Sequence, residues 1–131
     1  MEASDKIYFF DACYCFIAPA ILEPFGLTTL EAWAREKPVI RSDNEGSRYL
    51  FDLEEVPTPF IVKDKGIVVN FDKKRAENLA AAIIFLLTNE DKAKRMGELG
   101  RKIIVEKYSW DKTTINYKEI YQKASKKQLE G

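Results

Sequence analysis

The sequence predicts an α/β fold: a Rossmann-like parallel sheet of about three strands with flanking helices. Residues 13–42 read as a buried strand, a helix and a second buried strand, and such a unit forms a right-handed parallel crossover. A third apolar run at residues 67–71 is followed by helical apolar spacing as far as residue 124. For a chain of 131 residues we expect one domain, residues 1–131, with a single hydrophobic core.

Capping residues and a proline mark the ends of the elements in the first half of the chain. Ser4 or Asp5 can cap an initial helix, and Pro38 ends the second helix because proline cannot continue one. The expected elements are a helix over residues 4–12, a strand over 13–19, a helix from about 25 to 36 and a strand over 38–42. The loops after the two strands, residues 20–26 and 42–47, then lie at the edge of the sheet where ligands bind.

Prolines and turn residues divide the second half of the chain. Pro57 and Pro59 exclude regular structure over residues 54–60, so we expect a loop there that packs Phe60 and Ile61 onto the body. The other expected elements are a turn over residues 43–47, a short helix over 48–53, a strand over 67–71, helices over 73–89, 89–107 and 110–124, the last capped by Ser109, and a frayed polar end over 126–131.

The charge balance and the lack of histidine exclude several classes of function. Basic and acidic residues number 21 each, so the zero net charge predicts no broad attraction to nucleic acid or to an anionic membrane. No apolar run is long enough to be a transmembrane segment and no signal pattern opens the chain, which favours a cytoplasmic protein. Without histidine, Ser-His-Asp and Cys-His catalysis are excluded.

The two cysteines, Cys13 and Cys15, occupy alternate positions of the first expected strand, so they should point to one face. We expect both to be small buried apolar side chains. A lone C-x-C has too few ligands for a metal site, and the chain has no histidine to complete one. We therefore expect no metal and no cofactor.

Residues 20–32 join the first strand to the following helix and concentrate the polar chemistry of the chain. Gly26 lets a ligand approach the main chain closely, and the N–H groups of Gly26, Leu27 and Thr28 would face it. The hydroxyls of Thr28 and Thr29 add donors at the same helix end, where the helix dipole is positive. This junction therefore suits an anion such as a phosphate.

Two carboxylates, Glu23 and Glu31, flank the junction with seven residues between them. Carboxylates accept hydrogen bonds from vicinal hydroxyls, so the pair suggests recognition of a polyol such as ribose or a hexose. A structural interpretation stands beside it, in which Glu23 substitutes for an N-cap, Glu31 is a solvated helix residue and Gly26 is only a turn. Acid–base hydrolysis of a glycoside would need a paired geometry that spacing alone does not show.

Short segments along the whole chain occur in an order typical of one family of enzymes. They are EPFGLTTLEA at residues 23–32, KPVI at 37–40, Ser42-Asp43, GIVV at 66–69, Met96-Gly97 with Arg101, and Tyr108-Ser109-Trp110. The first segment resembles the E-x7-E region of retaining glycosyltransferases of the GT-B fold, in particular glycosyltransferase family 4 and the glycogen synthase-like group. The resemblance implies that this chain is a truncated GT-B C-terminal domain, the donor-binding one, of which it corresponds to the second half.

The resemblance also implies an activity and a division of roles. Such hexosyltransferases move a sugar from a nucleotide donor to an acceptor hydroxyl with retention, generally without a bound metal. Glu23 would be the catalytic-site carboxylate beside the donor sugar hydroxyls, and Glu31 would bind the nucleotide ribose. The other implied contacts are Phe25, Gly26 and Leu27 to the donor sugar, and Leu27, Thr28 and Thr29 to the diphosphate.

The chain departs from the family pattern in two places. NEGSRY at residues 44–49 stands where the family has a glycine-rich turn followed by proline and glutamate, which leaves the role of this loop open. The match begins at the helix before Cys13, so it does not include the strands with a basic pair for the diphosphate, nor the amino-terminal acceptor domain. We interpret Arg41 and Arg48 as solvated surface residues rather than as replacements for that pair.

We therefore expect a nucleotide-sugar-binding segment of a glycosyltransferase of carbohydrate biosynthesis. It should be inactive or weakly active alone and be completed by an N-terminal domain or a separate chain. The alternative is a non-catalytic remnant that acts as a sugar-nucleotide-binding or protein-interaction module, and that self-associates through a bare sheet edge. Tyr8, Phe9 and Phe10 are candidates to cover that edge.

Overall fold

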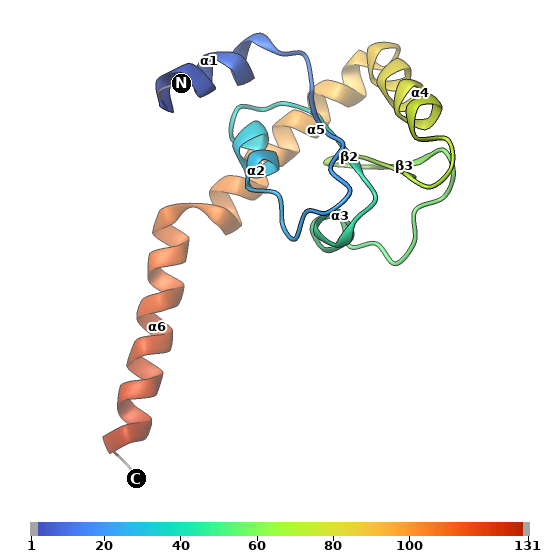
Figure 1. Ribbon diagram of the computed structural model, residues 1–131. Coiled ribbons are helices and arrows are strands. Elements are labelled where there is room, and N and C mark those ends of the chain that lie inside the picture. Colours follow the sequence, from blue (N-terminus) through green and yellow to red (C-terminus); the bar gives the residue numbers. More distant parts are fainter. Residues whose placement is uncertain (1–2, 130–131) are drawn as a thin grey trace.

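The computed structural model describes residues 3–129 and shows an α/β fold (Figure 1). The described residues form one four-stranded sheet in the order β1-β2-β4-β3. Its strands are β1 (Phe16–Ala18), β2 (Val39–Ser42), β3 (Phe60–Lys63) and β4 (Gly66–Val69). β1, β2 and β4 are parallel, and β3 pairs antiparallel with β4. The predicted fold class, with its parallel strands and flanking helices, is confirmed.

The edge strand β3 corrects the expectation of a loop that packs Phe60 and Ile61 onto the body. Pro57 and Pro59 both precede the strand, so they exclude regular structure only up to residue 59. Phe60 pairs with Val69, and a short turn connects β3 to β4 as a hairpin. The strand therefore exists because a neighbour supplies its hydrogen bonds, which the local sequence pattern does not reveal.

The helical pattern after the last strand is confirmed. The helices are α1 (Ala3–Ala12), α2 (Leu27–Ala34), α3 (Glu45–Phe51), α4 (Arg75–Leu87), α5 (Glu90–Ile103) and α6 (Trp110–Leu129), with a π-helical turn (Ile104–Tyr108) between α5 and α6. Helix α3 begins before the expected residue 48 because Asn44 caps it. The side-chain oxygen of Asn44 accepts a hydrogen bond from the backbone N–H of Ser47 at 2.9 Å.

The first strand is shorter than expected, and the cysteines lie before it rather than on it. The Cys13 thiol donates a hydrogen bond to the carbonyl oxygen of Phe10 at 3.2 Å, so the half-buried Cys13 lies against the last turn of α1. Cys15 is half-buried, and burial raises the pKa of its thiol above the ordinary value. The Cys15 side chain therefore remains a neutral thiol at neutral pH.

The sheet separates two apolar clusters, where a single core was expected. Alternate residues of β2 point to opposite faces: Val39 lies in the first cluster and Ile40 in the second. The first cluster comprises Phe10, Ala32, Trp33, Val39, Leu50, Phe51, Val56 and Val68. The second comprises Ile40, Ile67, Val69, Ala82, Leu86, Ala93 and Met96. Residues of α1, α2 and α3 thus cover one face of the sheet, and residues of α4 and α5 cover the other.

The aromatic residues of α1 divide between the core and the solvent. Phe10 is buried, with its ring centroid 5.4 Å from that of Phe16. Phe10 thus packs against the edge strand β1, to which Phe16 belongs. Tyr8 and Phe9 are exposed and remain available on the helix surface.

Helix α6 extends away from the rest of the chain (Figure 1). Ser109 is confirmed as its N-cap, because the hydroxyl oxygen accepts a hydrogen bond from the backbone N–H three residues later at 3.3 Å. The backbone remains helical to Leu129, past the residue 126 at which we expected fraying to begin. Residues 130–131 and the side chain of Ser4, a proposed cap of α1, lie outside the described part. No described helix is both long and apolar enough to cross a membrane.

Candidate functional site

The N-terminus of α2 is open to solvent and has no side-chain cap. Gly26 occupies the N-cap position with φ 92°, a left-handed conformation that favours glycine. Leu27 and Thr28 follow it and are exposed, whereas Thr29 is buried. The first amides of a helix have no intrahelical acceptor, and the positive end of the helix dipole lies with them. This end of α2 can therefore receive an anion; that it binds a diphosphate stays a prediction.

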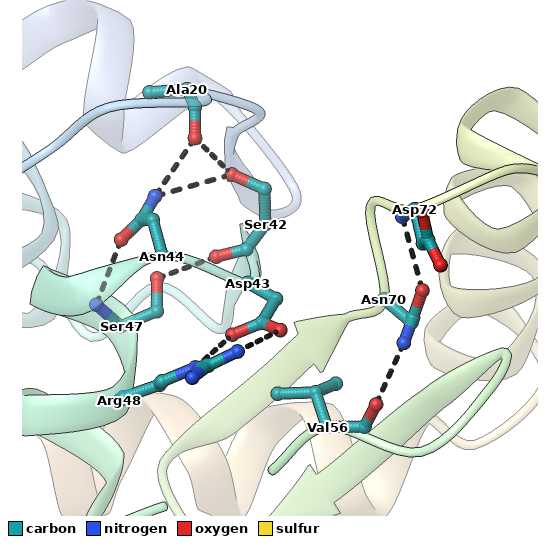
Figure 2. A network of polar contacts seen from close by, with 9 residues as sticks. All are labelled: Ala20, Ser42, Asp43, Asn44, Ser47, Arg48, Val56, Asn70 and Asp72. Atoms are coloured by element: carbon teal, nitrogen blue, oxygen red, sulfur yellow. Dashed lines mark hydrogen bonds and ion pairs between the residues drawn. The ribbon is translucent and has the colours of Figure 1, made fainter. Parts of the chain in front are cut away.

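A network of polar contacts holds the preceding loop in place, as Figure 2 shows. The Ser42 hydroxyl and the Asn44 side-chain amide both donate to the carbonyl oxygen of Ala20, at 2.5 and 2.8 Å. The Ser47 hydroxyl donates to the carbonyl oxygen of Ser42 at 2.6 Å. The loop after β1 is thus tied to the loop after β2 through short hydrogen bonds.

A backbone hydrogen bond also holds Glu23 in place. The backbone N–H of Gly46, in the first turn of α3, donates to the carbonyl oxygen of Glu23 at 2.9 Å. A Cβ atom at residue 46 would overlap that carbonyl oxygen, so only glycine allows this approach. Residues 44–49, whose role the sequence left open, therefore position the loop that carries Glu23. The sequence signal for this role was Asn44 as an N-cap followed by Glu45 in the first turn of a helix.

Replacing Asn44 by alanine should lower the free energy of unfolding by about 1–2 kcal/mol, because it removes both a helix cap and the bond to Ala20. Urea unfolding followed by circular dichroism would measure the loss. The control is Asn116→Ala on exposed α6, where only helix propensity changes and the effect should stay below about 0.7 kcal/mol. Equal effects of the two substitutions would contradict the positioning role.

The Phe25 side chain packs inward rather than toward a ligand. Its ring centroid lies 6.1 Å from that of Tyr49 and 6.0 Å from that of Tyr108, so it links the loop to α3 and to the π-helical turn. The carbonyl oxygen of Phe25 accepts a hydrogen bond from Arg41 Nη1 at 2.9 Å. Any contact of residue 25 with a sugar would therefore use the remaining main-chain groups.

Arg41 is buried, which overturns its interpretation as a solvated residue. It lies on β2 and is 1% exposed, and its Nε and Nη2 have no hydrogen-bond partner among the described residues. Burial lowers the pKa of Arg41 below its ordinary value, and the nearby Glu23 carboxylate acts in the opposite direction. Arg48, by contrast, is exposed and pairs with Asp43 at 2.7 Å, as a surface residue does. The two arginines thus have different environments.

Glu31 forms an ion pair with α1, in which Lys6 Nζ lies 2.5 Å from Glu31 Oε2. Both side chains are partly exposed, so Glu31 is neither buried nor an unpaired solvated residue. Glu23 does not substitute for an N-cap, because Gly26 occupies that position. The structure therefore places the two carboxylates in separate charge environments, Glu23 near Arg41 and Glu31 beside Lys6.

A polar cleft of about 450 Å³ lies at the carboxyl ends of β2 and β4. Its charged lining residues are Asp43, Arg48, Glu55, Asp72 and Arg75. None of the predicted site residues lines it. The candidate site is thus the exposed start of α2 with its loop, and the cleft is a neighbouring feature of the same sheet edge.

Comparisons with known proteins agree on one family. Residues 1–103 match the family described as glycosyl transferases group 1. The chain is 32% identical over 120 residues to the alpha-maltose-1-phosphate synthase of Mycolicibacterium smegmatis, covering 87% of this chain and 28% of that protein. It is 28% identical over 117 residues to an uncharacterized glycosyltransferase of Methanocaldococcus jannaschii, covering 89% and 30%.

A solved structure supports the same relation. The sucrose-phosphate synthase of Thermosynechococcus elongatus superposes with a TM-score of 0.73 at 26% identity, covering 88% of this chain and 26% of that chain. The chain therefore spans less than a third of the length of the proteins it matches here.

Proposed function

Because the chain belongs to the glycosyl transferases group 1 family, we propose that it binds the nucleoside-diphosphate sugar of a retaining glycosyltransferase. Its mostly parallel open sheet is that of a part of a GT-B enzyme. The observation that carries the proposal is the uncapped N-terminus of α2, with Gly26 at positive φ and a carboxylate on either side of it. Exposed helix amides bind phosphate groups, and carboxylates bind sugar hydroxyls.

Each part of the donor has a proposed contact. Glu23 accepts hydrogen bonds from the donor sugar hydroxyls at the catalytic site, and main-chain groups of Phe25, Gly26 and Leu27 approach the same sugar. Leu27, Thr28 and Thr29 bind the diphosphate through amides and hydroxyls, and Glu31 binds the ribose. Stabilising the leaving diphosphate is an electrostatic contribution that lowers the barrier to transfer. No covalent step is required of these residues.

Catalysis by this site requires an acceptor-binding part outside the 131 residues, either an N-terminal domain or a separate chain. The matched relatives, about three times longer, support this view. The chain alone should therefore transfer sugar slowly or not at all. Sugar transfer by the chain alone at ordinary enzyme rates, on the order of 1–1,000 per second, would contradict the proposal that the acceptor-binding part lies outside these residues.

Replacing Glu31 by glutamine should weaken binding of the donor by about 10- to 100-fold, because it removes a charged acceptor from the ribose hydroxyls. Calorimetric titration with nucleoside-diphosphate sugars carrying uracil, guanine or adenine would measure this. Glu98→Gln is a matched control, since Glu98 is also a partly exposed helix carboxylate beside a lysine, Lys94. Absence of binding to any of these donors by the unmodified chain would refute the proposal.

A non-catalytic interaction module is the second candidate function, favoured by the surface of α1. Ile7, Tyr8 and Phe9 are exposed there, and β1 lies at the edge of the sheet. Exposed apolar residues beside an open edge are typical of association sites. Sedimentation of the chain with and without Tyr8→Ser and Phe9→Ser separates the two candidates. The interaction module would be favoured if the unmodified chain self-associates and binds no donor, and if the self-association disappears in the double variant.

A further inference from the structure

Arg41 lies directly beneath the turn that begins α2. A Cβ atom at residue 26 would lie 2.7 Å from Arg41 Cζ, so the guanidinium is in contact with the Gly26 main chain. Nη1 donates to the carbonyl oxygen of Phe25, while Nε and Nη2 have no partner in the described part of the chain. Among the described residues, the Glu23 carboxylate acts on the charge of Arg41, and it accepts no hydrogen bond from Nε or Nη2.

A second polar group of the same turn has no partner. The Thr29 hydroxyl is buried, and no hydrogen bond to its oxygen is found among the described residues. Buried polar groups and charges are normally paired, because removal from water without a partner is unfavourable. The Arg41 guanidinium of β2, the Thr29 hydroxyl and the first amides of α2 thus lie together at the Gly26 turn with unused donors.

We propose that Arg41 supplies the positive charge of an anion site at the N-terminus of α2, which takes the diphosphate of the donor. The amides of α2 face the ligand, and the guanidinium behind the Gly26 turn adds a full charge to the partial charge of the helix end. Because Arg41 is shielded from water, its charge acts strongly over a short distance. The identity of the anion rests on the proposed function; the existence of the anion site does not.

A purely structural role for Arg41 predicts different behaviour. In that case Arg41 only connects β2 to the carbonyl oxygen of Phe25, and its charge is irrelevant. Glutamine at this position can still donate a hydrogen bond but carries no charge, whereas lysine retains the charge without the planar group. Comparing the glutamine and lysine variants therefore separates a role of the positive charge from a role of the hydrogen bond to Phe25.

The test measures binding of inorganic pyrophosphate to the 131-residue chain by calorimetry and by the shift in melting temperature. We expect Arg41→Gln to bind about tenfold or more weakly than the unmodified chain, and Arg41→Lys to recover most of the loss. Arg48→Met is the matched control, because Arg48 is an exposed arginine of the neighbouring helix α3, so this variant should bind as the unmodified chain does. Three results would each overturn the proposal. Arg41→Gln could bind pyrophosphate as tightly as the unmodified chain, Arg41→Lys could bind as weakly as Arg41→Gln, or the unmodified chain could fail to bind pyrophosphate.

A measurement on the unmodified chain covers the case in which a variant does not fold. In a nitrogen-15 spectrum of the arginine side chains, pyrophosphate should shift the Nε–H resonance of Arg41 and leave that of Arg48 in place. An unmoved Arg41 resonance at saturating pyrophosphate would overturn the proposal. Pyrophosphate binding that depends on Arg41, without binding of any nucleoside-diphosphate sugar, would keep the anion site and refute the proposed function. Sugar-nucleotide binding by Arg41→Gln that equals binding by the unmodified chain would keep the proposed function and refute the role of Arg41 in the anion site.

Discussion

Replacing Trp33 by alanine should lower the free energy of unfolding by about 3–5 kcal/mol, the largest loss we expect from a single substitution. Trp33 is 0% exposed, and its ring centroid lies 5.8 Å from that of Phe51. Its indole N–H donates to the carbonyl oxygen of Lys65 at 3.0 Å, so truncation also leaves that carbonyl without its partner. Chemical denaturation followed by circular dichroism would measure the loss.

The other tryptophan is the natural control. Trp110 begins α6 and is 84% exposed, so Trp110→Ala should change the free energy of unfolding by less than about 0.5 kcal/mol. A similar small change for both tryptophans would show that the first apolar cluster does not hold α2 to the sheet as described.

Replacing Gly97 by alanine should destabilise the chain although alanine is the better helix former. Helix propensity alone favours alanine by about 1 kcal/mol. A Cβ atom at residue 97, however, would overlap the carbonyl oxygen of Glu36, because α5 crosses the end of α2 at this point. Overpacking costs about 1–3 kcal/mol and occasionally more, and a backbone atom cannot rotate away, so we expect a net loss of about 2–3 kcal/mol.

Urea unfolding of Gly97→Ala beside Glu98→Ala decides between propensity and packing. Glu98 is the next residue of α5 and is partly exposed, so its replacement should stay within about 0.5 kcal/mol of the unmodified chain. A stabilised Gly97→Ala variant would mean that α5 does not approach α2 this closely.

Features that depend on neighbouring residues along the chain were predictable. Ser109 caps α6 as expected. The second helix also ends before Pro38, although a backbone turn with Glu36 at positive φ ends it at Ala34, not the proline. The turn at Gly26 and the start of α2 also lie where the sequence indicated. In each case the determining interaction spans only a few residues, so it is visible in the local pattern.

Features that depend on distant residues were not predictable. The strand β3 exists through pairing with β4, and the role of Asn44 lies in a bond to Ala20 across two loops. An arginine in a strand reads as a surface residue, because charged side chains are rarely buried. Only the packing of the Gly26 turn over β2 shows that Arg41 is enclosed.

The sequence by itself determined the fold class, the start of α6 at its cap Ser109 and the position of the turn that begins α2. These follow from side-chain periodicity and from backbone preferences, which act between near neighbours. The tertiary structure alone decided that Glu31 pairs with Lys6 and that Arg41 is enclosed behind Gly26. Burial and ion pairing depend on which segments meet in space, and that is settled only when the sheet and its helices pack together.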